Sequence, residues 1–358
     1  MSTDIQVSLI VLNWNGRRFL EPCLSSLSHQ TFPNFEIVLV DNGSNDGSVE
    51  FLERHFAPYL ASDSKPLLKL VKLNHNTGFA GGNLTGLATC NPTSRYIATL
   101  NNDTIVAPDW LEKLVKALDK REPNLVATKW AAACGPMLFA SSQSDDVPII
   151  AAAGIEVYRN GLTMDGKVGQ TWDERDTETS EVFGPCAGAA LYNRRALHEV
   201  GFFDEAFFAY LEDADLAWRL RLAGWHTLYV PQAQVWHEYS GTGGQNSPFK
   251  NFQLGRNRVW TILKNMPGRL LLRHLPAILW YDFAASLYTL SQGNRQPAHG
   301  RWAALKPKEL KRVWRQRRQI QKQRTATLIE IEAWLLPNQP LLENVRLRQK
   351  VDKLAKMG

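Results

Sequence analysis

The sequence predicts an α/β protein with a mainly parallel central sheet flanked by helices, followed by a mostly helical C-terminal extension. Over about the first 130 residues, short β-branched segments alternate with amphipathic helical segments, which is the pattern of a parallel sheet covered by helices. From residue 241 to residue 290 the sequence is mostly helical and aromatic, and a basic stretch follows. We therefore expect two parts, residues 1–240 and residues 241–358.

Each element of the first part has a local signal. The predicted strands cover residues 7–12, 36–40, 67–73 and 96–100, and the predicted helices cover residues 17–28, 48–56 and 109–120. In the last of these helices Trp110, Leu114 and Leu118 form part of an apolar stripe. Residues 130–200 are less regular, and helical character returns over residues 213–223.

The amino-acid composition disfavours several classes of protein. The chain has 358 residues, of which 44% are hydrophobic and 21% charged, so it can bury a large core. Its four cysteines are far apart and form no C-x-x-C pair, which disfavours a disulfide scaffold, a zinc ribbon and a thioredoxin-like site. No signal peptide is visible, and no apolar stretch reaches the roughly 18–20 residues of a membrane span. We expect a cytoplasmic protein.

The positive charge is concentrated in one segment. Residues 301–324 contain ten basic residues and a single acid, whereas the whole chain has a net charge of only +6. Such a stretch fits a polyanionic surface, either anionic lipid or nucleic acid. A solvated helical tail is the alternative.

Polar residues gather where three predicted strands end. The first strand ends in N-W-N-G, the second in D-N-G-S-N-D-G, and the strand over residues 96–100 in N-N-D. Each cluster alone would be an ordinary turn. Because ligands bind at the carboxyl ends of the strands in an open parallel sheet, three clusters together predict a binding site there. The sequence has no G-x-G-x-x-G after the first strand, no P-loop and no G-x-S-x-G motif. We therefore do not expect a Rossmann dinucleotide site, a P-loop phosphate site or the serine nucleophile of an α/β-hydrolase.

Four motifs in a fixed order carry a resemblance to a known family. They are V-D-N-G-S-N-D-G-S at 40–48, N-T-G-F-A-G-G-N at 76–83, L-N-N-D-T at 100–104 and F-A-Y-L-E-D-A-D-L-A-W-R-L at 208–220. Over about residues 5–265 the chain resembles the family 2 glycosyltransferases, in particular the bacterial rhamnosyltransferase-like branch. The resemblance implies a GT-A type fold, a nucleotide-diphospho-sugar donor, inversion at the anomeric carbon and a divalent metal, Mg²⁺ or Mn²⁺. Residues 1–240 would then form the nucleotide-sugar-binding and catalytic domain.

The resemblance also implies a nucleotide site. Asp41 and Ser44 match the family's base-and-ribose site, and Asn13 and Asn15 lie beside it if the first two strands are neighbours. Glycines in the second motif would let the backbone approach the ribose or phosphate closely, although the segment could instead open a helix. The full expected set is Asn13, Asn15, Asp41, Ser44, Asn76, Gly78, Gly81, Asn83, Asn101 and Asn102.

The metal and the diphosphate are assigned to the later motifs. N-N-D at 101–103 matches the family's D-x-D position with Asn101 in place of the first Asp, which makes Asp103 the expected metal ligand. His237 is expected to complete the metal shell, and an imidazole ligand suits Mn²⁺ better than Mg²⁺. Ser240 and Arg256 are expected to contact the diphosphate.

Glu212 and Asp213 begin a predicted helix, whose N-terminus favours a charged carboxylate. Adjacent residues of a helix point about 100° apart, so the two acids should have different roles. By resemblance Asp213 is the general base for the acceptor hydroxyl and Glu212 orients the sugar or acceptor. Gly188, Ala189 and Trp218 are expected beside the acceptor and the sugar. Simple complementarity to the helix dipole is the alternative for these acids.

The expected reaction moves a sugar, with rhamnose as the candidate, to a hydroxyl of a glycan or lipid-linked glycan in polysaccharide biosynthesis. A dTDP- or UDP-linked donor is favoured over a GDP-linked one, and no nucleic acid partner is expected. Residues 269–290 and the basic segment favour peripheral binding to an anionic membrane at its inner face, although these helices could instead cover the domain or form a dimer. Two other functions are possible alternatives. One is a sugar-nucleotide pyrophosphorylase, which N-W-N-G-R-R fits poorly, and the other is a non-catalytic membrane- or nucleic-acid-binding module, in which the acids would have no use.

Overall fold

A central sheet of eight strands organises the N-terminal part of the computed structural model, which describes residues 5–56, 66–121, 128–142, 147–238 and 247–356. Its strands are β1 (Val7–Asn13), β2 (Phe35–Asp41), β3 (Leu67–Lys72), β4 (Tyr96–Asn101), β6 (Lys129–Cys134), β11 (Ser180–Val182), β12 (Ala189–Asn193) and β13 (Trp225–Tyr229). The strand order is β11-β13-β6-β12-β4-β1-β2-β3. The pairs β1–β2, β1–β4, β2–β3 and β6–β13 are parallel, whereas β12 and β11 pair antiparallel to their neighbours. The predicted mainly parallel α/β sheet is confirmed.

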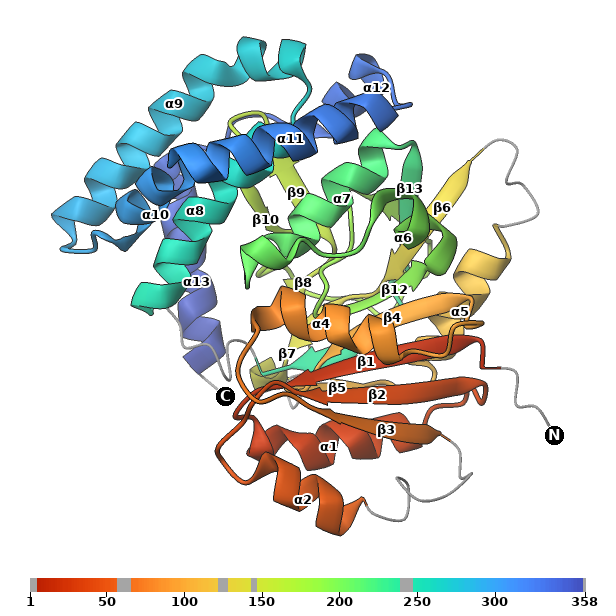
Figure 1. Ribbon diagram of the computed structural model, residues 1–358. Helices are drawn as coiled ribbons and strands as arrows, with labels where there is room; N and C mark the ends of the chain where they lie inside the picture. Colours follow the sequence, from red (N-terminus) through yellow and green to blue (C-terminus); the bar gives the residue numbers. More distant parts are fainter. Residues whose placement is uncertain (1–4, 57–65, 122–127, 143–146, 239–246, 357–358) are drawn as a thin grey trace.

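Helices cover both faces of this sheet. They are α1 (Arg17–Ser28), α2 (Ser48–His55), α4 (Gly78–Thr89), α5 (Trp110–Asp119), α6 (Arg194–Val200) and α7 (Glu212–Leu222). Side chains alternate between the two faces of a strand, so Leu9 of β1 packs in the core with α1, α2 and α5, while Ile10 packs in the core with α4, α6 and α7. Figure 1 shows α1 and α2 on one side of β1–β3 and α4 on the other.

Two smaller sheets complete this part. One consists of β5 (Thr104–Val106), β14 (Val235–His237), β7 (Met137–Phe139) and β8 (Ile150–Ala152), in that order. The other consists of β10 (Thr163–Asp165), β9 (Ile155–Tyr158) and β15 (Leu335–Leu336). The antiparallel pairing of β14 with β5 sets His237 opposite Thr104, and this register brings two distant segments of the chain together.

The C-terminal region is helical, as predicted. Its helices are α8 (Pro248–Asn265), α9 (Gly268–Ser291), α10 (Gln296–Ala304), α11 (Pro307–Gln323), α12 (Leu328–Ala333) and α13 (Leu341–Lys356). Glycines let α10 approach α8 closely, because a Cβ atom at Gly255 or at Gly300 would collide with the backbone of the other helix. The basic segment is not a free tail: the Arg317 side chain of α11 donates a hydrogen bond of 2.7 Å to the carbonyl oxygen of Met266.

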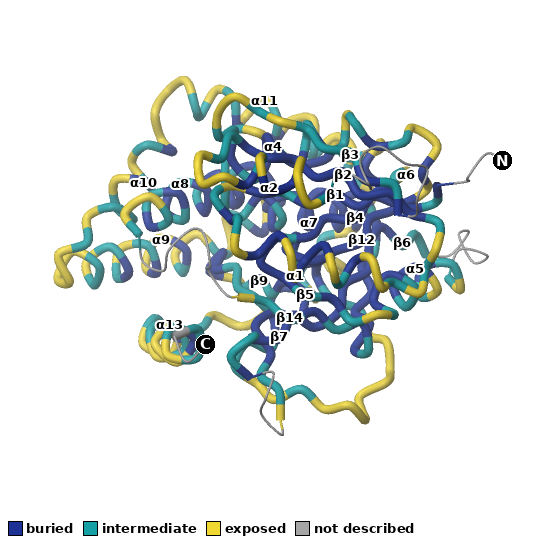
Figure 2. The backbone as a smooth tube through the Cα atoms, turned by 90° about the horizontal axis from the view of Figure 1, so that it is seen from below, coloured by how far each residue is buried: buried dark blue, intermediate teal, exposed yellow. Residues whose placement is uncertain are grey.

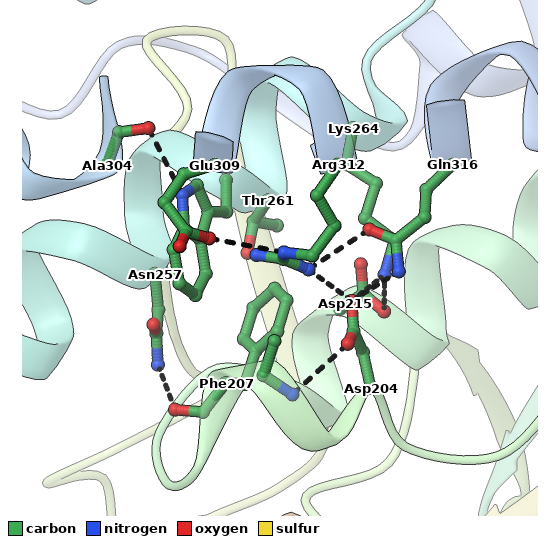
Figure 3. Close-up of polar contacts among 12 residues, drawn as sticks. Asp204, Phe207, Asp215, Asn257, Thr261, Lys264, Ala304, Glu309, Arg312 and Gln316 are labelled. Atoms are coloured by element: carbon green, nitrogen blue, oxygen red, sulfur yellow. Dashed lines mark hydrogen bonds and ion pairs between the residues drawn. The ribbon is translucent and has the colours of Figure 1, made fainter. Parts of the chain in front are cut away.

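A buried ionic network ties the helical region to the sheet (Figure 3). Lys264 of α8 lies 2.7 Å from Asp204 and 2.9 Å from Asp215 of α7. Asp215 also pairs with Arg219, four residues further along the same helix, at 2.9 Å. Burial alone would raise the pKa of Asp204, but the ammonium of Lys264 and the guanidinium of Arg312 outweigh it and lower the pKa to about 2. The network therefore holds α7, α8 and α11 in one arrangement.

Candidate active site

A cavity of about 790 Å³ lies at the carboxyl ends of the central strands, and its size is that of a small-molecule binding site. Trp14 lines it directly after β1, Asn42 directly after β2, and Asn102 and Asp103 directly after β4. The three polar clusters that follow these strands thus meet at one edge of the sheet. The remaining wall comes from α7, α8, α13 and the smaller sheets.

Asp103 and His237 form a close pair in this cavity. The pairing of β5 with β14 places the His237 Nε2 atom 3.2 Å from the Asp103 Oδ1 atom, and both side chains are largely buried. The backbone N–H of Glu238 donates a hydrogen bond of 2.9 Å to the carbonyl oxygen of Asp103, which fixes the register. Although burial lowers the pKa of His237, the carboxylate of Asp103 outweighs burial, so the pKa is raised.

The donor set of this pair fits a divalent cation. Apart from its contact with the imidazole, the buried Oδ1 atom of Asp103 has no hydrogen-bond partner among the described residues. A carboxylate and an imidazole are suitable ligands for Mn²⁺. Within the described ranges no group of three or more His, Cys, Asp or Glu side chains could hold a metal.

A chain of hydrogen bonds runs behind Asn102, away from the cavity. The Asn102 amide donates to the Asn13 Oδ1 atom at 2.6 Å, and the Asn13 amide donates to the Asp41 Oδ2 atom at 2.8 Å. The backbone N–H of Ser44 donates to the Asp41 Oδ1 atom at 2.9 Å, and the Ser44 Oγ atom accepts from the backbone N–H of Asn15 at 2.9 Å. Asn13, Asn15, Asp41 and Ser44 therefore lie together beside the cavity but do not form its lining, and their contact with a nucleotide stays a prediction.

Asn42, Asn76 and Gly78 form a second polar corner. The Asn42 amide donates to the Asn76 Oδ1 atom at 3.1 Å and to the Gly78 carbonyl oxygen at 3.0 Å. Gly78 has a φ of +80°, and a Cβ atom there would collide with the backbone of Phe208, so only glycine fits. All three residues line the cavity, which brings the first and second sequence motifs together.

The rest of the glycine-rich motif is placed differently from the prediction. Residues from Gly78 onward belong to α4, so Gly81 and Asn83 lie within a helix and not in a loop against the ligand. The side chain of Asn83 is buried and donates to the Phe79 carbonyl oxygen at 2.9 Å. A Cβ atom at Gly82 would collide with Leu12 of β1, so the glycines serve close packing of the helix on the sheet.

Asp213 and Glu212 begin α7 and line the cavity. The backbone N–H groups of Ala187 and Ala214 donate to the Asp213 carboxylate at 3.3 Å and 2.7 Å. Burial raises the pKa of Asp213 in spite of these donors. For Glu212, burial and the negative charge of Asp213 raise the pKa well above its ordinary value. The two adjacent acids thus differ: burial and the charge of Asp213 favour the protonated form of Glu212, whereas two backbone N–H donors favour the carboxylate form of Asp213.

The loop before these acids is strained and clamped. Phe208, Tyr210 and Leu211 have φ values of 64°, 71° and 66°, a region that costs a non-glycine residue about 1–3 kcal/mol. The side-chain amide of Asn257 on α8 donates to the carbonyl oxygens of Phe207, Ala209 and Tyr210 at 3.0, 2.9 and 2.7 Å. The side chain of Arg256, the preceding residue on α8, contacts the same loop.

Arg256 is a correction to the sequence prediction. Its guanidinium donates to the carbonyl oxygens of Ala206 and Phe207 at 3.2 Å and 2.9 Å and lies over the ring of Trp260, and it does not line the cavity. With its donors bound to the backbone, Arg256 supports the loop and does not meet a diphosphate in this arrangement. Ser240, the other residue expected at the diphosphate, lies outside the described residues.

The acceptor wall also needs correction. Gly188 lines the cavity as expected, whereas Ala189 is buried inside β12, where it pairs with Leu100 of β4. Trp218 is 2% exposed and packs edge-on against Phe183 in the core, so it does not contact a sugar. Its position on α7 turns it away from the cavity that Asp213 faces, because the two residues are five positions apart on the helix.

Several lining residues carried no sequence signal that pointed to a site. Asp165 of β10 interacts electrostatically with both Asp213 and His237, and burial and then the charge of Asp213 raise its pKa to about 7. Lys250 in the first turn of α8, together with Arg348 and Asp352 of α13, forms the opposite wall. Their interactions with one another affect the pKa of Lys250, which burial lowers. Trp14 does have a signal in the sequence, because it is an aromatic residue between two asparagines of a polar loop.

Comparisons with known proteins agree with this architecture. The family model described as Glycosyl transferase family 2 matches residues 8–201. The chain is 28% identical over 266 residues to an N-acetylglucosaminyl-diphospho-decaprenol L-rhamnosyltransferase of Mycobacterium tuberculosis, covering 68% of this chain and 79% of the relative. It is 30% identical over 116 residues to an uncharacterized glycosyltransferase of Haemophilus influenzae, covering 32% of this chain and 33% of that protein.

Two solved structures share the fold. GalNAc-T7 with UDP, GalNAc and Mn²⁺ superposes with a TM-score of 0.57 at 18% identity, covering 74% of this chain and 48% of that one. The mannosyltransferase PcManGT from Pyrobaculum calidifontis in complex with GDP-Man and Mn²⁺ superposes with a TM-score of 0.51 at 15% identity, covering 88% and 84%. At these identities the likeness concerns the fold, and it confirms the predicted GT-A type architecture.

Proposed function

This chain belongs to glycosyl transferase family 2, and we propose that it moves a hexose, with rhamnose as the first candidate, from a dTDP- or UDP-linked donor to a hydroxyl of a lipid-linked glycan with inversion at the anomeric carbon. One observation carries the proposal. Asp213 of α7 and the Asp103–His237 pair, which come from distant parts of the sequence, line the same cavity. The proposed base, Asp213, and the proposed pyrophosphate-binding pair, Asp103 and His237, can therefore face one bound donor molecule.

In the proposed reaction Asp213 accepts the proton of the acceptor hydroxyl while the sugar leaves the diphosphate in one displacement. The N–H groups of Ala187 and Ala214 orient its carboxylate, and Glu212 hydrogen-bonds a hydroxyl of the sugar or acceptor. Asp103 and His237 would hold Mn²⁺ or Mg²⁺. Such a cation neutralises charge on the departing nucleoside diphosphate.

The donor side is assigned to the asparagine-rich edge of the sheet. Asn42, Asn76, Asn101 and Asn102 line the cavity there, and the Asn13–Asp41–Ser44 hydrogen bonds support it from behind. Lys250 replaces Arg256 as the α8 cation that faces the cavity. Amide groups offer both donors and acceptors to the base and the ribose of a nucleotide.

The acceptor side is assigned to the wall formed by Gly188, Asp165 and α13. The Mycobacterium tuberculosis relative is named for a diphospho-decaprenol acceptor and for L-rhamnose, and this name supports a lipid-linked acceptor here. Arg348, a cation on the cavity wall, suits an acceptor that carries phosphate. Peripheral attachment to the inner face of a membrane would bring such an acceptor within reach.

A donor panel tests the proposal. The protein is incubated with dTDP-rhamnose and with UDP- and GDP-hexoses in the presence of Mn²⁺ and a synthetic diphospho-lipid glycan, and released nucleoside diphosphate is measured. We expect release with one dTDP- or UDP-sugar and a product whose anomeric configuration, read by NMR, is opposite to that of the donor. Retained configuration, or turnover confined to GDP-sugars, would contradict the mechanism or the donor assignment.

A further inference from the structure

The outward face of α9 is apolar along its whole length. We call Leu272, Leu275, Leu279, Trp280, Phe283, Leu287 and Leu290 the α9 outer face. Leu272 is 73%, Trp280 70% and Phe283 62% exposed, although the opposite side of the same helix already buries Ile278, Tyr281 and Ala285. From residue 272 to residue 290 the face extends about 27 Å at 1.5 Å per residue. An exposed apolar surface of this size marks a place where another molecule binds.

The exposed charged residues of α9, α10, α11 and their connections are all cations, of which Arg273 pairs with Glu332 of α12 at 2.7 Å. Along α9, α10, α11 and their connections the exposed cations are Arg269, Arg273, Arg295, Lys306, Lys308, Lys311, Arg315, Arg318 and Lys322. The two acids of these helices are partly buried: Asp282 pairs with Arg258 and Arg301, and Glu309 pairs with Arg312. Figures 1 and 2 show α9 and α10 together at one end of the molecule, with many exposed positions. The electrostatic potential of this end is therefore positive.

Exposed tryptophans indicate which kind of molecule binds the α9 outer face. Trp280, Trp302 on α10 and Trp314 on α11 are 70%, 74% and 47% exposed, and Trp is the side chain most typical of the boundary between lipid headgroups and acyl chains. No helix in the described part of the chain is long and apolar enough to cross a bilayer. A second copy of this chain is a poorer fit, because the cations of both copies would meet with no exposed acid between them.

Helix α9 connects its outer face with the active-site cavity through a contact with α13. On its inner side, the Tyr281 hydroxyl of α9 accepts a hydrogen bond of 2.6 Å from the Asn344 amide of α13. One to two turns further along α13, Leu347, Arg348 and Val351 line the cavity. A surface bound to α9 would thus lie next to the helix that forms the acceptor wall.

We propose that the α9 outer face and the cations of α9–α11 form a docking surface for an anionic lipid bilayer, with α9 lying in the plane of the headgroups. The apolar side chains would enter the boundary of the acyl chains, and the lysines and arginines would contact lipid phosphates. This docking does not depend on which sugar or acceptor the enzyme uses, so it stands apart from the proposed reaction.

Vesicle flotation of the full chain tests the proposal. Vesicles of phosphatidylglycerol with phosphatidylcholine are compared with vesicles of phosphatidylcholine alone. We expect the protein to float with the anionic vesicles only. The triple variant Lys308→Gln/Arg315→Gln/Arg318→Gln should bind them roughly 100-fold more weakly, given about 1 kcal/mol per cation. The control Arg18→Gln/Arg54→Gln/Arg195→Gln, which removes three exposed charges from α1, α2 and α6, should bind as the wild type does.

A second pair of variants tests how much the apolar side chains contribute to vesicle binding. Trp280→Ser/Phe283→Ser should weaken binding to anionic vesicles by at least about tenfold. Val147→Ser, at a half-exposed apolar residue far from α9 in the sequence, should not change it. Each variant is accepted only if its melting temperature and its rate of donor hydrolysis match the wild type. Equal flotation of the wild type and both docking-surface variants would overturn the proposal. It would also be overturned if the wild type is a dimer in size-exclusion chromatography without lipid and Trp280→Ser/Phe283→Ser makes it a monomer.

Discussion

The side-chain amide of Asn257 donates a hydrogen bond of 2.7 Å to the carbonyl oxygen of Tyr210, two residues before Glu212. Through this contact a helix of the C-terminal region holds the strained loop that leads into the catalytic helix. Two further carbonyl oxygens of the loop lie within 3.0 Å of the same nitrogen. The C-terminal region therefore contributes to the position of Asp213 although it supplies no base itself.

Replacing Asn257 with Asp tests this clamp. A carboxylate would face three carbonyl oxygens and repel them, so we expect the free energy of unfolding to fall by about 1–3 kcal/mol. A small displacement of Asp213 should lower kcat by about 100-fold, while the KM for the donor stays within the error of the wild type. Urea denaturation and steady-state kinetics measure the two effects.

The matched control for this variant is Asn294→Asp, whose Oδ1 atom accepts from the backbone N–H of Gln296 at 3.1 Å and would still do so as a carboxylate. It should leave both stability and kcat unchanged. If Asn257→Asp lowered stability but left the kcat of the folded protein intact, the clamp would have no role in positioning the base.

Asp165 should make stability depend on pH. Its pKa is raised to about 7 by burial and the charge of Asp213, while Lys250, His237 and Cys186 oppose the shift. Between about pH 4 and pH 7 the folded protein holds a proton that the unfolded chain has lost, so this contribution to stability is full below pH 4 and is lost as pH rises to 7. Asp165→Asn should therefore match the wild type at pH 4 and be more stable at pH 8, by a few kcal/mol at most, since one pKa unit corresponds to about 1.4 kcal/mol.

Thermal unfolding across this pH range measures the effect. Asp173→Asn is the control, because Asp173 pairs with Arg175 on the surface and its pKa is lowered to about 2 by that side chain. The control should show no gain at high pH. A constant difference between Asp165→Asn and the wild type from pH 4 to pH 8 would show that Asp165 titrates normally.

The metal assignment predicts a coupling between Mn²⁺ and the nucleotide. Calorimetry should show that UDP or dTDP binds at least about tenfold more tightly with Mn²⁺ than with EDTA, because a cation held by Asp103 and His237 would attract the negative charge of the pyrophosphate. Asp103→Asn should abolish most of that difference. It should leave the weak binding in EDTA unchanged, since the asparagine-rich nucleotide corner is not altered. Equal Mn²⁺ enhancement in the variant would contradict the role of Asp103.

The strands and the helices of the N-terminal part could be predicted because their signals are local. Apolar alternation and amphipathic stripes placed β1, β2, β3 and β4 and the helices α1, α2 and α5 within a residue or two. In the glycine-rich segment, the glycines are expected to bring the backbone close to the ribose or phosphate, with the opening of a helix as the alternative. A helix does form there, since Gly82 and Gly86 let α4 lie directly on Leu12 and Ile10.

Within the site, the resemblance pointed to side chains that do meet, such as Asp103 and His237. It could not show which way a helical residue faces, and Arg256 and Trp218 were assigned to the cavity although both point elsewhere. Arg348 and Asp352 were missed for another reason. They reach the cavity only because α13 folds back onto the first part of the chain, where Lys350 donates to the carbonyl oxygen of Gly169 at 2.8 Å. No local pattern encodes that contact.

The most direct test of the central claim compares Asp213→Asn with Glu212→Gln in single-turnover transfer from the identified donor. Loss of the base should reduce transfer by a factor on the order of 100 to 10,000, while calorimetry with Mn²⁺ shows unchanged binding of the nucleoside diphosphate. Glu212→Gln should retain far more activity, because glutamine keeps the size and hydrogen-bonding capacity of Glu212, which is not the proposed base. Transfer by Asp213→Asn at the wild-type rate, or equal loss in both variants, would contradict the assignment of Asp213 as the single base.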